Sequence, residues 1–100
     1  MYQFGYNPST LSYVYGHNSI PTLFITGAPA DTDTSRWAML HDGSDYRLYL
    51  GKSGNEDLIY QFGYNASSAD YEFGFRSIGQ LNLADTPDGS FKDDFAMLHD

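Results

Sequence analysis

The feature that most constrains this chain is that it contains much of its sequence twice. YQFGYN at residues 2–7 returns at 60–65, and WAMLHD at 37–42 returns as FAMLHD at 95–100. Both pairs are offset by 58 residues (60 − 2 and 95 − 37), so residues 2–42 align with 60–100 without a gap. Because repeated units bury their apolar faces against one another, a repeat sets the architecture. We therefore expect one repeat domain, residues 1–100, with unit 1 at 2–59 and a truncated unit 2 at 60–100.

Composition favours strands and excludes several partners. Aromatic residues make up 17% of the chain, mostly Tyr and Phe, which favours strands over helices. The formal net charge of −8 argues against nucleic acid as a partner, because duplex binding needs Lys and Arg to displace counterions. No stretch approaches the length needed to cross a bilayer, so we expect no membrane partner. The chain has no cysteine, which excludes disulfides and thiolate chemistry.

Segments with period-two alternation recur between Gly, Asn, Asp, Ser and Pro residues, which is typical of short strands. We expect an all-β fold, an antiparallel meander of two tandem units that resembles a propeller blade or a sandwich layer in length and strand count. The nine predicted strands are Tyr2–Tyr6, Leu11–His17, Thr22–Thr26, Trp37–His41, Tyr46–Leu50, Leu58–Tyr64, Tyr71–Arg76, Leu81–Leu83 and Phe95–His99.

The first hairpin can be given a register from its side chains. A four-residue loop at Asn7–Thr10 would place aromatic side chains opposite one another on one face, as a cross-strand ladder. The predicted pairs are Tyr6 with Leu11, Phe4 with Tyr13 and Tyr2 with Tyr15, and in the second copy Tyr64 with Ala69, Phe62 with Tyr71 and Tyr60 with Phe73.

Glycines recur on the other face of this hairpin. Gly5 and Gly16 return as Gly63 and Gly74. A glycine weakens a strand unless another part of the molecule must approach closely. We therefore expect tight packing against another sheet at these positions, with a groove for a ligand as the alternative.

The second hairpin is predicted to turn at Asp42-Gly43-Ser44-Asp45, a strong turn sequence. Pairing His41 with Tyr46 continues the alternation cleanly into the next strand, which favours a strand at Trp37–His41. The alternative is a short helix there, capped by Asp33 or Ser35 and stopped by Gly43.

The segments Gly27–Ser35 and Asp85–Lys92 are predicted to be loops, since both are polar and carry Pro29 and Pro87 at matched positions.

The repeat leaves two strand edges without a neighbour. The strand Phe95–His99 lacks the partner that Trp37–His41 finds in Tyr46–Leu50, and Tyr2–Tyr6 lacks the preceding strand. Exposed edges with apolar side chains promote association. We expect a homo-oligomer formed through these terminal edges; the alternatives are pairing of the two ends within one copy and a longer array.

No catalytic pattern is present in the sequence. His41 and Asp42 recur as His99 and Asp100, but neighbouring strand residues point to opposite faces, and no nucleophile elbow accompanies them. The acidic residues Asp85, Asp88, Asp93 and Asp94 with Gly89 could offer oxygen ligands to calcium, but they do not match the EF-hand spacing. We expect no enzymatic activity, no cofactor and no metal.

Aromatic, amide and acidic residues near the turns are typical of sugar recognition, in which apolar faces stack and polar groups bind hydroxyls. The predicted ligand-binding residues are Asn7, Trp37, Asp42, Tyr46, Arg47 and Tyr49, with Asn65 and Asp100 in the second copy. The sequence thus favours a lectin-like module with a glycan ligand. The alternative is a protein-interaction or self-assembling scaffold module, including an acidic inhibitor or immunity type, because Tyr, Trp and Arg are also enriched in protein interfaces.

Overall fold

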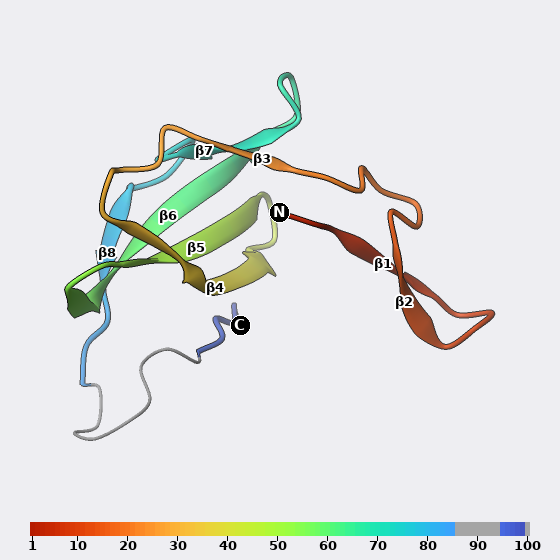
Figure 1. The fold of residues 1–100 in the computed structure, drawn as a ribbon, viewed down its shortest axis with the longest axis horizontal. Helices are drawn as coiled ribbons and strands as arrows, with labels where there is room; N and C mark the ends of the chain where they lie inside the picture. The colour runs from red at the N-terminus through yellow and green to blue at the C-terminus, as the bar shows by residue number, and fades with distance from the viewer. Residues whose placement is uncertain (86–94, 100) are drawn as a thin grey trace.

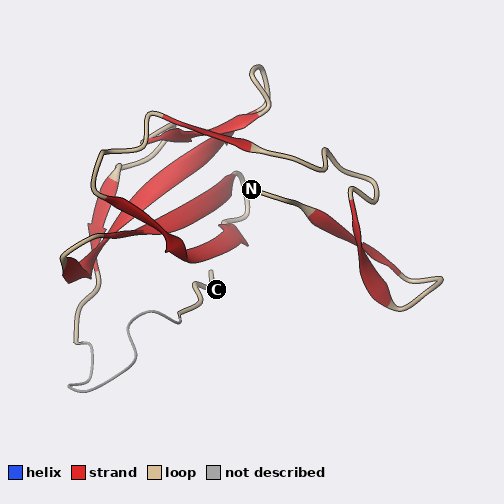
Figure 2. Ribbon diagram, in the orientation of Figure 1, coloured by secondary structure: helices blue, strands red, loops and turns tan. Residues whose placement is uncertain are grey.

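A computed structural model describes residues 1–85 and 95–99, and in this part of the chain the fold is all-β, with strands and loops and no helix (Figure 2). No helix in the described ranges is therefore long and apolar enough to span a membrane. The strands are β1 (Phe4–Asn7), β2 (Ser12–Tyr15), β3 (Phe24–Thr26), β4 (Thr32–His41), β5 (Tyr46–Lys52), β6 (Asn55–Asn65), β7 (Asp70–Phe73) and β8 (Gln80–Asn82).

The strands form one curled sheet and one separate hairpin. The six-stranded sheet has the order β3-β7-β6-β5-β4, and β8 pairs with β6 off this path. It curls into a half-barrel, from which the β1–β2 hairpin projects to one side (Figure 1). Residues that precede the hairpin strand join it to the sheet, because Tyr2 forms a bridge with Thr22 and the amide of Leu23 donates to the carbonyl of Met1.

The second hairpin is confirmed as predicted. β4 and β5 pair with His41 opposite Tyr46 and Trp37 opposite Leu50. The turn closes through a hydrogen bond of 3.0 Å from the Asp42 amide to the Asp45 carbonyl. Trp37–His41 is therefore strand, and the alternative of a short helix is wrong.

The predicted register of the first hairpin is wrong by two residues. β1 and β2 place Phe4 opposite Tyr15 and Tyr6 opposite Tyr13. The turn has four residues, as predicted, but it lies one residue later, at 8–11, because Leu11 takes a left-handed conformation (φ 55°) and stays outside the strand. The second copy repeats the difference, with Phe62 opposite Phe73, Tyr64 opposite Tyr71, and Ala69 at φ 57°. A register shift of two residues leaves each side chain on the same face of the hairpin, so the predicted aromatic ladder is present.

Two further predictions are corrected. The sheet is mixed rather than wholly antiparallel, since β3 pairs with β7 in parallel. The predicted loop Gly27–Ser35 ends early, because β4 begins at Thr32 and pairs with the end of β5 before the register shifts between Asp33 and Trp37. Of the other predicted loop, only its first residue, Asp85, lies within the described residues.

The predicted strand Phe95–His99 is not a strand in the structure. The segment lies beside β4, where the guanidinium of Arg36 sits over the Phe95 ring at 6.0 Å. A strand requires a ladder of backbone hydrogen bonds to a neighbour, and these residues make a side-chain contact instead.

The core lies on one face of the sheet, since its members on β5 and β6 occupy alternate positions. Its buried residues come from the central strands and from the segment that leads into β3, with Met1, Ile25, Met39 and Tyr64 packed against them. The fully buried members of the chain include Phe62, Leu48, Leu50 and Ile59, all on β5 or β6. The core cluster comprises Leu23, Leu48, Leu50, Tyr60, Phe62 and Tyr71.

Local geometry recurs at the 58-residue offset of the sequence. The Gln3 amide donates to the Pro21 carbonyl at 2.8 Å, and the Gln61 amide donates to the Gly79 carbonyl at 2.7 Å. The Gly16 amide donates to the Gln3 carbonyl, and the Gly74 amide donates to the Gln61 carbonyl, both at 3.0 Å. The hairpin β1–β2 and the pair β6–β7 thus have the same local backbone arrangement, although only β6–β7 is part of the sheet.

The recurring strand glycines allow a close backbone approach. A side chain at Gly63 would collide with the Phe75 carbonyl oxygen and would lie 2.9 Å from Arg47 Nη1. A side chain at Gly5 would collide with the His17 carbonyl oxygen in the same way. Tight packing is therefore present at these two glycines, but the expectation of another sheet is wrong, because the approaching atoms belong to the loop after the next strand.

We predict that Gly63→Ala lowers the free energy of unfolding by about 1–3 kcal/mol, because a buried clash must be relieved by moving the loop or Arg47. Urea denaturation measures the change. Gly5→Ala is the matched control and should leave the unfolding midpoint of the sheet nearly unchanged, since its hairpin stands outside the sheet. Equal losses in the two variants would contradict this account of the fold.

Candidate functional site

Two open grooves lie where the projecting hairpin meets the sheet. The first, here called the tyrosine groove, has a volume of ≈ 510 Å³ and is lined by the hairpin, by the loop after β2 and by tyrosines of the sheet. The second, here called the methionine groove, has a volume of ≈ 800 Å³ and separates the first four residues from the edge strand β4.

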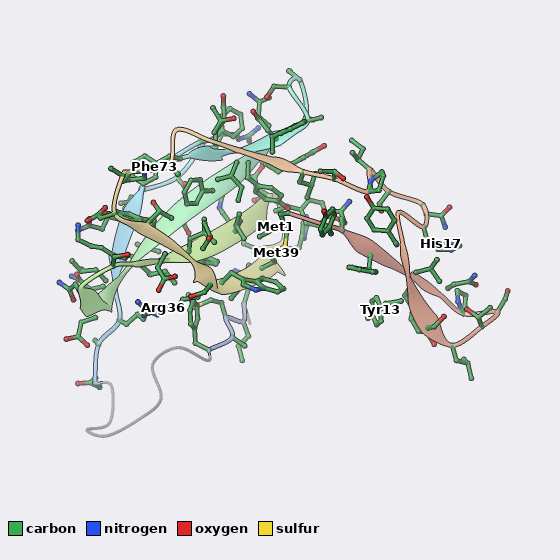
Figure 3. All side chains as sticks on the ribbon, in the orientation of Figure 1. Met1, Tyr13, His17, Arg36, Met39 and Phe73 are labelled. Carbon is green, nitrogen blue, oxygen red and sulfur yellow. The ribbon has the colours of Figure 1, made fainter. Side chains whose placement is uncertain are left out.

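The methionine groove lies at the open side of the half-barrel. Met1 and Met39 face it from opposite sides and lie near one another in Figure 3. Trp37, a predicted ligand-binding residue, is also in its lining and is 53% exposed. The groove is therefore mainly apolar, and it continues the hydrophobic core to the surface.

The tyrosine groove has a more mixed lining. Tyr46, Tyr64 and Tyr71 line it from the sheet, and the predicted site residue Tyr46 is the most exposed of the three at 56%. Polar groups reach it from the hairpin side. They include Gln3, His17, Asn18 and Ser19.

The structure brings three predicted site residues together at the β4–β5 turn. Arg47 Nε lies 3.3 Å from Asp42 Oδ2, and Tyr46 stacks edge-on against His41 with ring centroids 4.5 Å apart. Arg47 also pairs with Asp45 at 3.5 Å. The sequence did not predict this ion-pair cluster, although acids flank the arginine at the turn.

The turn strongly favours the charged form of Asp42. Its carboxylate accepts hydrogen bonds from the amides of Asp45 (2.7 Å) and Ser44 (3.1 Å). These two bonds are the largest causes of a pKa lowered from 3.8 to about 2, and the nearby guanidinium of Arg47 adds a smaller contribution.

The other predicted site residues are apart from this cluster. Tyr49 is buried at 6% exposure and offers almost no surface to a ligand. Asn7 and Asn65 occupy equivalent turns, where each side-chain oxygen accepts an amide hydrogen bond from the residue two positions ahead. Asn65 also donates to Glu72 at 3.0 Å. Asp100 lies outside the described residues.

A second polar cluster joins the start of β4 to the middle of the sheet. The hydroxyl of Tyr60 donates to Asp31 at 2.5 Å, and Lys52 Nζ lies 2.9 Å from the carboxylate of Asp31. The hydrogen bond from Tyr60, followed by that from Lys52, lowers the pKa of Asp31. All of these groups are paired with one another, so we assign the cluster a structural role.

The aromatic face of the β1–β2 hairpin is a surface that the predicted ligand-binding residues do not include. In β6 and β7 the equivalent residues Tyr60, Phe62 and Tyr71 are 3%, 0% and 2% exposed. In the hairpin, Tyr2, Phe4 and Tyr13 are 71%, 55% and 71% exposed. The sequence had indicated this surface through the predicted aromatic ladder and the predicted open edge of Tyr2–Tyr6.

The hairpin also has an unpaired backbone edge. The Gln3 amide donates a hydrogen bond to the segment before β3, and the Gln3 carbonyl accepts one from the residue after β2. Both groups therefore face the same edge of the strand. Because groups alternate along a strand, those of Tyr2 and Phe4 face the opposite edge. Among the described residues, β1 pairs only with β2, whereas the corresponding edge of β6 is covered by β5.

Within residues 1–85 and 95–99, no group of three or more His, Asp or Glu side chains is placed to hold a metal ion. Comparison with known proteins found no matching family model, no similar curated protein and no similar solved structure. The candidate site is therefore defined by geometry alone: the exposed aromatic hairpin and the tyrosine groove beside it.

We predict that Asp42 contributes stability above its unfolded-state pKa of about 3.8 and loses that contribution as pH falls through its folded-state pKa of about 2. The sign follows because the folded state binds the proton less readily than the unfolded state. An NMR titration of the Asp42 carboxyl measures the pKa directly. In Asp42→Asn, the decrease in stability between about pH 4 and pH 2 should be smaller; an unchanged acid profile would refute the role of this turn.

Proposed function

We propose that the chain is a non-enzymatic protein-interaction and self-assembly module that adds a strand from another repeat unit to the free edge of β1. The observation that carries this proposal is the contrast between two hairpins that both contain the sequence YQFGYN. β6 and β7 are covered and buried, while β1 and β2 present the same aromatic residues to solvent.

A partner strand would stabilise the hairpin in two ways, by burying its exposed aromatic face and by pairing with the free backbone edge of β1. Burying a large apolar side chain contributes about 1.5–3 kcal/mol, so covering the hairpin would contribute far more than the strand hydrogen bonds alone. An exposed apolar strand edge is a known route to association between sheets. Strand addition gives main-chain hydrogen bonds for affinity, and side-chain pockets give specificity.

We also propose that the two tandem units, residues 2–59 and 60–100, belong to a propeller-like or sandwich-like repeat, in which each unit supplies the strand that its neighbour needs. The shared backbone hydrogen bonds at the 58-residue offset support this proposal. A second copy can supply such a strand, and the chain would then be a homo-oligomer.

We predict that the chain self-associates as its concentration rises and that Phe4→Lys shifts it toward monomer. A lysine at this position places a charge on the face that must be buried. Sedimentation velocity over a range of concentrations measures the association. Phe24→Lys is the matched control, because Phe24 is an equally large residue, 70% exposed, on the edge strand β3.

A folded wild-type chain that stays monomeric at high micromolar concentration would contradict self-association. Equal weakening by Phe4→Lys and Phe24→Lys would show that association does not depend on β1.

A lectin-like function is the second candidate, and the tyrosine groove favours it. Tyr46 and Tyr64 offer aromatic surface, and Gln3 and Asn18 offer polar groups for hydroxyls, as glycan sites require. Binding of the wild-type chain to a glycan array, lost in Tyr46→Ala while the fold and the oligomer persist, would favour this candidate over strand addition.

A further inference from the structure

Arg47 occupies a defined socket on the covered hairpin. Its guanidinium lies over Gly63, where only a glycine leaves room, and Nη2 donates to the carbonyl of Arg76 at 3.0 Å. Nη1 lies 3.5 Å from the carbonyl oxygen of Phe75. The side chain is buried at 7% exposure, so the socket and its acidic partners at the β4–β5 turn enclose it.

The projecting hairpin has the same set of one glycine and two backbone carbonyls, here called the frame, at the equivalent positions. Gly5 corresponds to Gly63, and the carbonyls of His17 and Asn18 correspond to those of Phe75 and Arg76. The loops have matching conformations, since Asn18 has a φ of 50° and Arg76 a φ of 51°. Both loops also begin with the same hydrogen bond. The His17 amide, after Gly16, donates to the Val14 carbonyl, and the Phe75 amide, after Gly74, donates to the Glu72 carbonyl.

This second frame is open to a ligand. Gly5, His17 and Asn18 all line the tyrosine groove. Within the part of the chain that the structure describes, no hydrogen bond is made to the carbonyls of His17 or Asn18.

We propose that Gly5 and the carbonyls of His17 and Asn18 form an arginine socket, which receives the guanidinium of a strand that pairs along β1. This inference rests on the proposed strand addition and specifies its partner. The ligand is an extended strand of the β5 type, because in the existing pair Arg47 lies opposite Gly63 and Leu48 lies opposite Phe62. The partner strand thus carries an arginine opposite Gly5 and a leucine opposite Phe4.

The source of that strand is a second copy that exchanges its β4–β5 hairpin, because an identical element can be swapped between copies. Within one folded copy, β5 is paired on both sides, with β4 and β6. A β4–β5 hairpin also carries its own acidic partners for the arginine, as Asp42 and Asp45 do here. The complete hairpin is therefore the unit of recognition.

The two sockets differ at one position that provides a second test. Arg76 lies 3.7 Å from Asp45 of the bound hairpin, whereas Asn18 carries no charge at the equivalent position. Because Arg76 already adopts the same left-handed conformation at the equivalent position, an arginine in Asn18→Arg can take up this backbone and supply the missing ion pair.

The test uses the full chain and a synthetic peptide with the sequence of residues 37–52, titrated by calorimetry and followed by amide NMR shifts. The native peptide should bind and shift the amides of Gly5, His17 and Asn18. The Arg47→Ala peptide should bind about tenfold or more weakly, since it loses charged hydrogen bonds to the carbonyls.

The Asn18→Arg chain should bind the native peptide about two- to fivefold more tightly, as a partly exposed ion pair allows, and the Asp45→Asn peptide should abolish that gain. This variant strengthens binding, so its result does not depend on a damaged fold.

The outcomes separate the two proposals. Equal binding of the native and Arg47→Ala peptides would overturn the arginine socket and leave strand addition standing. No binding of either peptide would overturn the socket together with strand addition by a β5-type hairpin. Shifts confined to Gly63, Phe75 and Arg76 would mean that the peptide replaces the chain's own β5, and they would overturn the assignment to Gly5.

Discussion

The covering of β6 by β5 is the interaction on which the rest of the structure depends. It buries Leu48 and Leu50 against Phe62 and Tyr60, and these four residues supply most of the core cluster. It also carries Arg47 into the socket above Gly63, which fastens the β4–β5 turn to the loop after β7. The same sequence without that neighbour, in β1, remains a narrow hairpin with exposed aromatic side chains.

Burial thus depends on the neighbour and not on the sequence of the strand itself. Tyr2 and Tyr60 begin the same six-residue motif, yet one is 71% exposed and the other 3%. Apolar side chains at such density are rarely left uncovered on a protein that works alone, and contiguous apolar patches mark interaction sites. The hairpin, the tyrosine groove and the methionine groove together form a surface suited to a partner with strands of its own.

Patterns that depend on local chemistry were predictable from the sequence, and arrangements that depend on distant contacts were not. Alternation and the Asp-Gly turn predicted the β4–β5 hairpin and its register correctly. The register of β1 and β2 was missed because it depends on a left-handed Leu11, a residue type that gives no turn signal. The parallel pairing of β3 with β7 joins segments far apart in the chain, and no local pattern encodes it. The site prediction identified Trp37 and Tyr46, which line the two grooves, but not the carbonyl groups beside Gly5, because residue types do not reveal the positions of backbone carbonyls.

Amide hydrogen exchange at Phe4, Gly5 and Phe62 tests the central claim most directly. The Phe4 amide faces the free edge of β1, the Gly5 amide faces β2, and the Phe62 amide faces β5. We predict that at low protein concentration Phe4 exchanges rapidly while Phe62 is strongly protected, and that protection of Phe4 rises as the concentration or the hairpin peptide is increased. Two results would contradict the proposed strand addition to β1: a Phe4 amide that is equally protected at every protein concentration, or one that stays unprotected when the hairpin peptide is saturating.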